Sequence, residues 1–92
     1  IKKMKQIGTV KIIKKNPCAY CDRAINLLKG KGYEIEIVDL TDNWDEILNW
    51  KAKTGWQTVP IIFINDTLIG GYNELKALEN DGKLDELLTK PL

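Results

Sequence analysis

The strongest constraint on the fold is a pair of cysteines, Cys18 and Cys21, the only two in the 92-residue sequence. They follow a β-branched apolar run, residues 9–13, and stand at the head of a helical pattern. Residues three apart lie on one helix face with Cβ atoms about 5–6 Å apart, close enough for a disulfide after a small adjustment. The spacing therefore predicts a reversible dithiol where a strand passes into a helix.

The two cysteines are expected to differ in reactivity. At a helix N-terminus, unpaired backbone N–H groups and the macrodipole favour negative charge, so we expect a stabilised thiolate at Cys18. Cys21 lies one turn further in and belongs to an apolar stripe with Ala24, Ile25 and Leu28. We therefore expect Cys21 to be the shielded partner.

Charge and hydropathy narrow the classes of function. The net charge is +1, with no basic field of the kind that draws nucleic acid, so we expect no nucleic-acid partner. No apolar run approaches the roughly 20 residues of a membrane-spanning helix, and no signal-peptide core follows the lysine-rich start at residues 1–5. We therefore expect a cytoplasmic protein without membrane contact. In that reducing compartment, closely spaced cysteines are catalytic or metal-binding more often than structural.

The absence of histidine also limits the chemistry. Imidazole is excluded as a metal ligand or general base, and two thiols alone cannot complete a four-ligand zinc site within one chain. The length fits one domain, residues 1–92, with room for a modest core.

The hydrophobic pattern predicts an α/β fold with the order β-α-β-α-β-β-α. We expect strands at 9–13 and 34–39, and a helix that begins at about Cys18 and has Gly30 and Gly32 as its stop signals. We also expect a helix at 44–53 capped by Asp42 or Asn43, hairpin strands at 61–64 and 67–69, and a last helical segment after Gly70-Gly71. The first two strands, joined by a helix, are expected to be parallel. The last segment should pack its leucines on the sheet, namely Leu75, Leu78, Leu84, Leu87 and Leu88.

Three motifs together give a resemblance to a known family. Cys18-Ala19-Tyr20-Cys21 is followed by Thr58-Val59-Pro60 before the hairpin, and by Gly70-Gly71 at the start of the last helical segment. In this order and at these separations, the motifs resemble those of the glutaredoxins, over roughly residues 8–89. The resemblance implies a thioredoxin-like fold, with a central four-stranded mixed sheet flanked by helices. It also implies that Pro60 is cis and stands opposite the cysteine turn.

The resemblance further implies a glutathione site. Its residues would be Lys15, Tyr20, Gln57, Thr58, Val59, Pro60, Gly71, Tyr72 and Asn73. Lys15, with Lys14 as its rival, would pair with a glutathione carboxylate and favour the thiolate. The Val59 backbone would bond the cysteinyl part of glutathione, and the N–H groups after Gly71 would bind the second carboxylate.

Other residues near this site are harder to assign. Glu74 also falls in the implied site, but a carboxylate there opposes an anionic ligand, so direct contact is assigned to the backbone and Asn73. Tyr72 fits the core or the rim equally well. Of the three tryptophans, only Trp56 is expected near the rim of the site, whereas Trp44 and Trp50 are expected to be packing residues.

Two residues depart from the family's common pattern. Ala19 stands where proline is common. Unlike proline, alanine leaves φ free to vary and keeps the backbone N–H, and we expect this either to alter the redox potential or to make room for a bridged iron–sulfur cluster. Gln57 stands where arginine or lysine is frequent. It can hydrogen-bond a carboxylate but lacks the charge, so we expect modest glutathione affinity.

The function implied by the resemblance is that of a glutathione-dependent thiol–disulfide oxidoreductase, with roles in electron transport and cell redox homeostasis. Cys18 would attack and Cys21 would resolve, with glutathione as reducing co-substrate. The chain would act as a monomer, and its partners would be glutathionylated or disulfide-bonded proteins. A thioredoxin-like donor served by a reductase is disfavoured by Tyr20 and by the lack of a tryptophan before Cys18. The alternative is a homodimeric carrier of a glutathione-ligated [2Fe–2S] cluster, with Cys18 as ligand.

Overall fold

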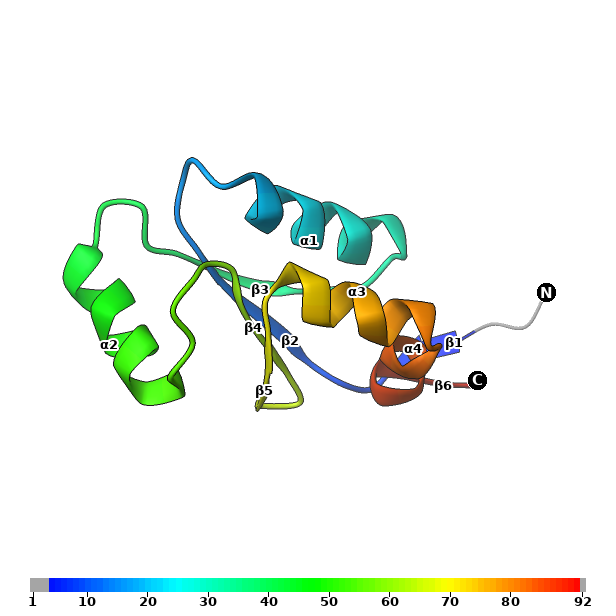
Figure 1. Cartoon of the computed structure of the whole chain (residues 1–92). Helices are drawn as coiled ribbons and strands as arrows, with labels where there is room; N and C mark the ends of the chain where they lie inside the picture. Colours follow the sequence, from blue (N-terminus) through cyan, green and yellow to red (C-terminus); the bar gives the residue numbers. More distant parts are fainter. Residues whose placement is uncertain (1–3, 92) are drawn as a thin grey trace.

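A four-stranded mixed sheet with helices on both faces forms the centre of the fold (Figure 1). The structure is a computed structural model and describes residues 4–91. Its elements are, in order, β1 (Met4–Gln6), β2 (Val10–Lys14), α1 (Ala19–Gly30), β3 (Glu36–Asp39), α2 (Trp44–Thr54), β4 (Ile61–Ile64), β5 (Thr67–Gly70), α3 (Tyr72–Asn80), α4 (Lys83–Leu88) and β6 (Thr89–Pro91). None of the helices within residues 4–91 is long and apolar enough to cross a membrane.

The strand order in the central sheet is β3-β2-β4-β5. Strands β2 and β3 run parallel, as the sequence predicts, whereas β4 is antiparallel to both β2 and β5. The hairpin between β4 and β5 turns at Asn65 and Asp66, with φ values of 53° and 64°. A two-residue turn with positive φ at both positions matches the right-handed twist of the strands, which explains the asparagine and aspartate there. The predicted fold class is confirmed.

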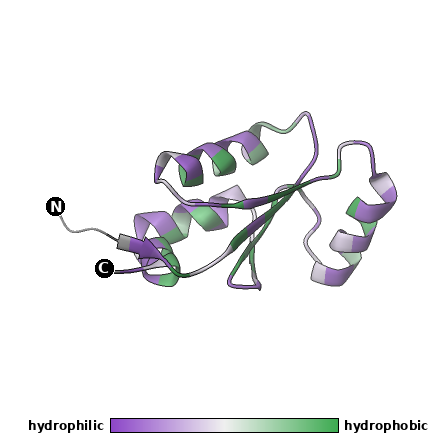
Figure 2. Ribbon diagram, turned by 180° about the vertical axis from the view of Figure 1, so that it is seen from behind, coloured by the Kyte–Doolittle hydropathy of each residue, from purple (hydrophilic) through white to green (hydrophobic). Residues whose placement is uncertain are grey.

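The strands alternate their side chains between two hydrophobic cores. Because successive residues of a strand point to opposite faces, Ile12 and Ile62 join one core while Ile13 and Ile61 join the other. The larger core lies under α1, α3 and α4, and the smaller one under α2. Figure 2 shows the hydrophobic residues along the crossing strands and on the inner side of α1.

Helix α2 begins and ends close to where the sequence predicts. Asn43 is its N-cap, and the Asn43 side chain accepts a hydrogen bond from the Glu46 N–H at 3.2 Å. Gly55 ends the helix in the left-handed conformation, with φ +72°, and its N–H bonds the Lys51 carbonyl at 2.8 Å. Only Ile47 of this helix is fully buried. One side of α2 is therefore left to solvent.

The C-terminal part of the chain departs from the predicted order. The last helical segment is two helices, because Gly82, with φ +74°, separates α3 from α4. The six-residue α4 buries the pair Leu84 and Leu88, which lie four apart on one face, and Leu87 is left 40% exposed. The prediction that Leu87 packs on the sheet is therefore wrong. An additional antiparallel pair, β1 with β6, joins the two ends of the described chain.

A polar cluster connects the end of α1 to α3 and α4. Lys31 Nζ lies 2.5 Å from Glu79 and 3.0 Å from Asp85, and the Tyr33 hydroxyl donates to Asp85. Hydrogen bonds from Tyr33 and Lys31 lower the pKa of Asp85. Burial opposes the charge of Lys31, but the hydrogen bonds to Glu79 and Asp85 outweigh it and raise the pKa of Lys31. Burial and the bond to Asp85 raise the pKa of Tyr33.

We expect this cluster to make stability fall on both sides of neutral pH. Asp85, whose pKa is lowered on folding, contributes stability above the unfolded value of about 3.9 and loses it as the pH drops through its folded pKa. Lys31 and Tyr33 have pKa values that are raised on folding. Each contributes stability below its unfolded pKa of about 10 and loses that contribution as the pH rises through its folded pKa. Urea unfolding at about pH 3, pH 7 and pH 10.5 measures both arms. Asp85→Asn should lose less stability between neutral and acid pH than the wild type, whereas exposed Asp66→Asn should match the wild type. An equal acid loss in all three proteins would contradict the role of Asp85.

Candidate active site

Cys18 and Cys21 form a disulfide at the N-terminus of α1. Strand β2 ends at Lys14, and Cys18 is the N-cap, with an extended backbone at φ −156° and ψ 102°. Its sulfur takes the place of the usual capping oxygen, because Cys18 Sγ accepts a hydrogen bond from the Cys21 N–H at 3.1 Å. The Cα atoms are 5.2 Å apart, within the ordinary range for a disulfide. The predicted dithiol at a strand–helix junction is therefore confirmed in its geometry.

The two sulfurs differ in access to solvent. Cys21 is 0% exposed and lies in the inner stripe of α1, as the sequence predicts, whereas Cys18 is partly exposed. The Cys18 sulfur lies at the positive end of the helix and accepts a backbone N–H, and both features would stabilise a thiolate there once the pair is reduced. This arrangement provides one accessible nucleophile and one shielded thiol within reach of it.

The Thr58-Val59-Pro60 loop stands opposite Cys18, as the resemblance implies. The Val59–Pro60 peptide bond is cis, and so is Asn16–Pro17 before the cysteine pair. Val59 O lies 3.8 Å from Cys18 Sγ. Backbone groups of this loop are therefore next to the reactive sulfur.

A cavity of about 360 Å³ opens beside this loop. It is lined by Tyr20, Trp56, Thr58, Val59, Gly71, Tyr72, Asn73 and Glu74. The rings of Tyr20 and Tyr72 have centroids 6.0 Å apart and form one wall. Six of the predicted binding residues are thus brought together from three separate parts of the chain.

The other three predicted binding residues do not line this cavity. Lys15 Nζ lies 4.9 Å from the centre of the Trp44 ring, and Gln57 Nε2 donates to Gly55 O at 3.4 Å. Pro60 is buried directly before β4. The rival of Lys15, Lys14, is the last residue of β2 and pairs in register with Asp39. Which lysine contacts glutathione stays a prediction.

Two further residues, Trp56 and Glu74, complete the cavity. The Trp56 ring packs against Gly70 and Gly71, and Trp56 Nε1 is buried without a hydrogen-bond partner among the described residues. Glu74 Oε1 accepts the Gly71 N–H at 3.0 Å, which is half of a capping box at the start of α3. The sequence signal for Glu74 is its place three residues after the N-cap glycine. For Trp56 the signal is its position beside the Thr58-Val59-Pro60 loop.

The described residues do not fit an iron–sulfur cluster held by one chain. Within residues 4–91, no three His, Cys, Asp or Glu side chains gather to hold a metal ion. A [2Fe–2S] cluster takes four ligands, and this chain has two thiols, which are joined to each other. A cluster would therefore need ligands from outside this chain.

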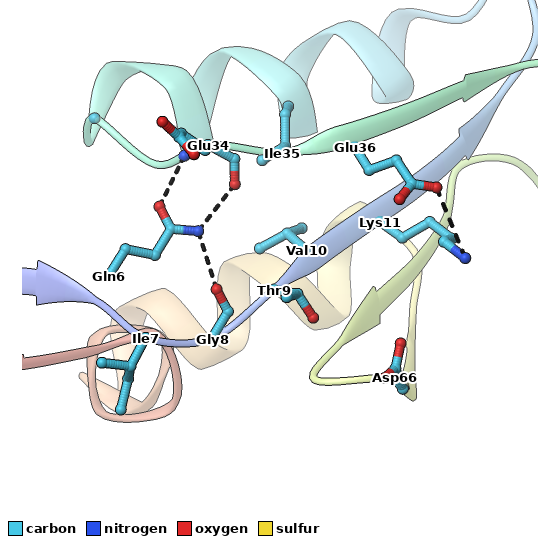
Figure 3. Close-up of a pocket in the computed structure, with 11 residues that line it drawn as sticks. Gln6, Ile7, Gly8, Thr9, Val10, Lys11, Glu34, Ile35, Glu36 and Asp66 are labelled. Carbon is cyan, nitrogen blue, oxygen red and sulfur yellow. Dashed lines mark hydrogen bonds and ion pairs between the residues drawn. The ribbon is translucent and has the colours of Figure 1, made fainter.

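A larger hollow, of about 690 Å³, lies near the opposite end of β2 (Figure 3). It runs between residues 6–11 and residues 32–36. The Gln6 amide is fully used there, since it donates to Gly8 O and Glu34 O and accepts the Glu34 N–H. Neither Cys18 nor Cys21 lines this hollow. The larger volume of a cavity therefore does not identify the active site in this chain.

An accessible cysteine at a helix N-terminus, opposite a cis-proline loop on a mixed sheet, is the arrangement of thiol–disulfide oxidoreductases with the thioredoxin-like fold. The glutaredoxin family model matches residues 10–69, and the chain belongs to the glutaredoxin family. The Cys18–Cys21 pair fits the dithiol active site of that family.

Individual relatives agree with this assignment. The chain is 40% identical over 72 residues to a glutaredoxin of Pseudomonas aeruginosa, covering 78% of this chain and 86% of the relative. It is 38% identical over 82 residues to glutaredoxin 3 of Escherichia coli, covering 89% and 99%. A crystal structure of a buckwheat glutaredoxin–glutathione complex superposes with a TM-score of 0.80 at 28% identity, covering 88% of this chain and 76% of that one.

Proposed function

We propose that this chain uses glutathione to reduce protein–glutathione mixed disulfides and protein disulfides. The observation that carries the proposal is the position of Cys18, which is partly exposed, with Sγ 3.8 Å from the Val59 carbonyl that borders the cavity. The buckwheat relative, which forms a complex with glutathione, supports the choice of ligand. We place the glutathione backbone along Val59 and one of its carboxylates at the free N–H groups of the first turn of α3.

Reduction of a glutathionylated protein requires only Cys18. Its thiolate attacks the glutathione sulfur, the bond between glutathione and the protein breaks, and the protein leaves as a thiolate that takes up a proton. A second glutathione thiolate then attacks the glutathione sulfur held on Cys18. Oxidised glutathione leaves, and the Cys18 thiolate is restored beside the α1 N-terminus.

Reduction of a protein disulfide requires both cysteines. Cys18 attacks one sulfur of the substrate, and the other leaves as a thiolate. Cys21 then attacks the Cys18 sulfur, which releases the fully reduced substrate and forms the Cys18–Cys21 disulfide. Two glutathione molecules reduce that disulfide in turn. The buried position of Cys21 keeps it from attacking substrates directly.

This division of roles predicts a selective defect in Cys21→Ser. The variant should keep most of its turnover of a small glutathionylated disulfide and lose reduction of a protein disulfide such as insulin, because no thiol resolves the mixed intermediate. Coupled assays with glutathione and glutathione reductase measure the first activity, and insulin precipitation measures the second. Loss of both activities in a folded variant would contradict the assignment of Cys21 as the resolving thiol.

The remaining predictions from the sequence have direct tests. Sedimentation equilibrium tests the prediction that the protein is a monomer, and fractionation of the source cells tests its predicted cytoplasmic location. Visible absorption of protein purified without air, in the presence of glutathione, tests the [2Fe–2S] alternative. The motive for that alternative is Ala19, which stands at the first position of α1.

A further inference from the structure

Helix α2 presents an unpartnered apolar face to solvent. Trp44 is 53% exposed and Leu48 is 45% exposed, and residues four apart lie on the same side of a helix. Ile47, which lies further round the helix, is buried in the smaller core. Exposed aromatic and aliphatic side chains that adjoin each other are typical of contact surfaces for other proteins.

Two lysines from different parts of the chain lie at the Trp44 ring. Lys15 Nζ is 4.9 Å from the ring centroid, and Lys51 Nζ, one helical turn beyond Leu48, is 5.2 Å from it. Neither lysine forms an ion pair with any carboxylate in the part of the chain that the structure describes. The ring quadrupole attracts both ammonium groups, but their charges repel each other. A carboxylate placed beside the ring would be attracted by both lysines at once. We call Lys15, Trp44, Leu48 and Lys51 the α2 patch.

The α2 patch adjoins the reactive cysteine. Lys15 belongs to the loop between β2 and α1, three residues before Cys18. The same loop is fastened to the segment that leads into α2, because the Asn16 N–H donates to Thr41 Oγ1 at 2.9 Å. Figure 1 shows these two segments near each other, at the end of the sheet where α1 begins. A polypeptide whose sulfur lies at Cys18 can therefore extend across the patch.

We propose that the α2 patch docks an acidic segment of the substrate protein. In this segment, a carboxylate near the oxidised cysteine pairs with Lys15 and Lys51, and an apolar side chain covers Trp44 and Leu48. The proposal rests on the proposed function, since it identifies the class of protein that Cys18 reduces. It gives the enzyme a preference among protein substrates that depends on Trp44, Leu48 and Lys51, none of which lines the cavity beside the Thr58-Val59-Pro60 loop.

The test compares two glutathionylated peptides of equal length. One carries glutamates and a leucine beside its cysteine, and in the other the glutamates are glutamines. Wild type should reduce the acidic peptide with a kcat/KM about fivefold higher, the effect expected of one or two exposed ion pairs. Added salt should reduce this preference because Lys15 and Lys51 are both partly exposed to solvent. Lys51→Gln and Trp44→Ala should each reduce the preference, and the matched control Lys76→Gln, an exposed lysine on α3, should leave it intact.

A small glutathionylated disulfide separates this proposal from the proposed function. If wild type reduces it but treats the two peptides alike, the α2 patch does not select substrates, although the oxidoreductase activity stands. If wild type does not reduce it at all, the proposed function fails and the docking proposal fails with it. Lys51→Gln keeps Ile47, the buried residue of α2, so it decides the question even if Trp44→Ala unfolds. A wild-type dimer that Trp44→Ala or Lys51→Gln dissociates would assign the patch to a second copy of the chain and overturn the proposal.

Discussion

Cys18→Ser is expected to reduce both glutathione-dependent activities to the uncatalysed background. Serine provides no comparable anionic nucleophile at physiological pH, so neither a glutathionylated protein nor a protein disulfide can be attacked. The fold should survive, because serine is a preferred N-cap residue and its oxygen can accept the Cys21 N–H that the sulfur accepts now. The assays are the coupled glutathione assay and insulin reduction, on the same preparations.

The matched control is Cys21→Ser, which removes the other sulfur and the same disulfide. Cys18→Ser should unfold at a urea concentration similar to that of the fully reduced wild type, whereas Cys21→Ser should unfold at a lower one, because it buries a hydroxyl in the apolar stripe of α1. Measurable turnover by folded Cys18→Ser would show that Cys18 is not the attacking residue. It would transfer that role to Cys21, despite its burial.

Gly70→Ala is expected to be the most destabilising of the exchanges considered. Gly70 has φ +126°, where an L side chain is strained, and an added Cβ would lie 2.9 Å from both Trp56 Cη2 and Glu74 Cγ. Strain and overpacking together should cost about 2–4 kcal/mol. Each kcal/mol lowers the melting temperature of a domain of this size by about 4–8 °C. Urea unfolding and thermal melting measure the loss.

Gly55→Ala is the control that isolates the contact with Trp56. Gly55 also has positive φ, +72°, but an added Cβ there meets no heavy atom within 4 Å. Its exchange should cost only the backbone strain, about 1–2 kcal/mol. If Gly70→Ala is no more destabilising than Gly55→Ala, the packing of Trp56 on the two glycines does not constrain the cavity wall.

The parts of the fold that the sequence predicts are those set by local chemistry. The turn at Asn65 and Asp66 needs residues that tolerate positive φ, and the ends of α2 are set by an N-cap asparagine and a C-terminal glycine. The alternation along β2 and β4 requires two faces, both of which are covered. These signals lie within a few residues of the structure they determine.

The departures depend on distant contacts. The direction of the Lys15 side chain is set by Trp44, which lies 29 positions further along the chain. The exposure of Leu87 follows from the break at Gly82, which changes the face that α4 turns to the sheet. The pair β1 and β6 joins three-residue strands whose short sequences carry no clear alternation. The local sequence pattern around each of these residues therefore does not predict its direction, exposure or strand pairing.

The length of the turn between β4 and β5 is constrained by hydrogen bonds of Asn65. Asn65 Oδ1 accepts the Thr9 N–H at 2.9 Å, and Asn65 Nδ2 donates to Leu87 O at 3.1 Å. One side chain thus fastens the hairpin to the segment before β2 and to the end of α4. Exposed loop tips are usually where families of proteins gain or lose residues and where engineers insert tags. An insertion at this turn would carry Asn65 away from both partners, so the turn length is constrained by contacts outside the hairpin itself.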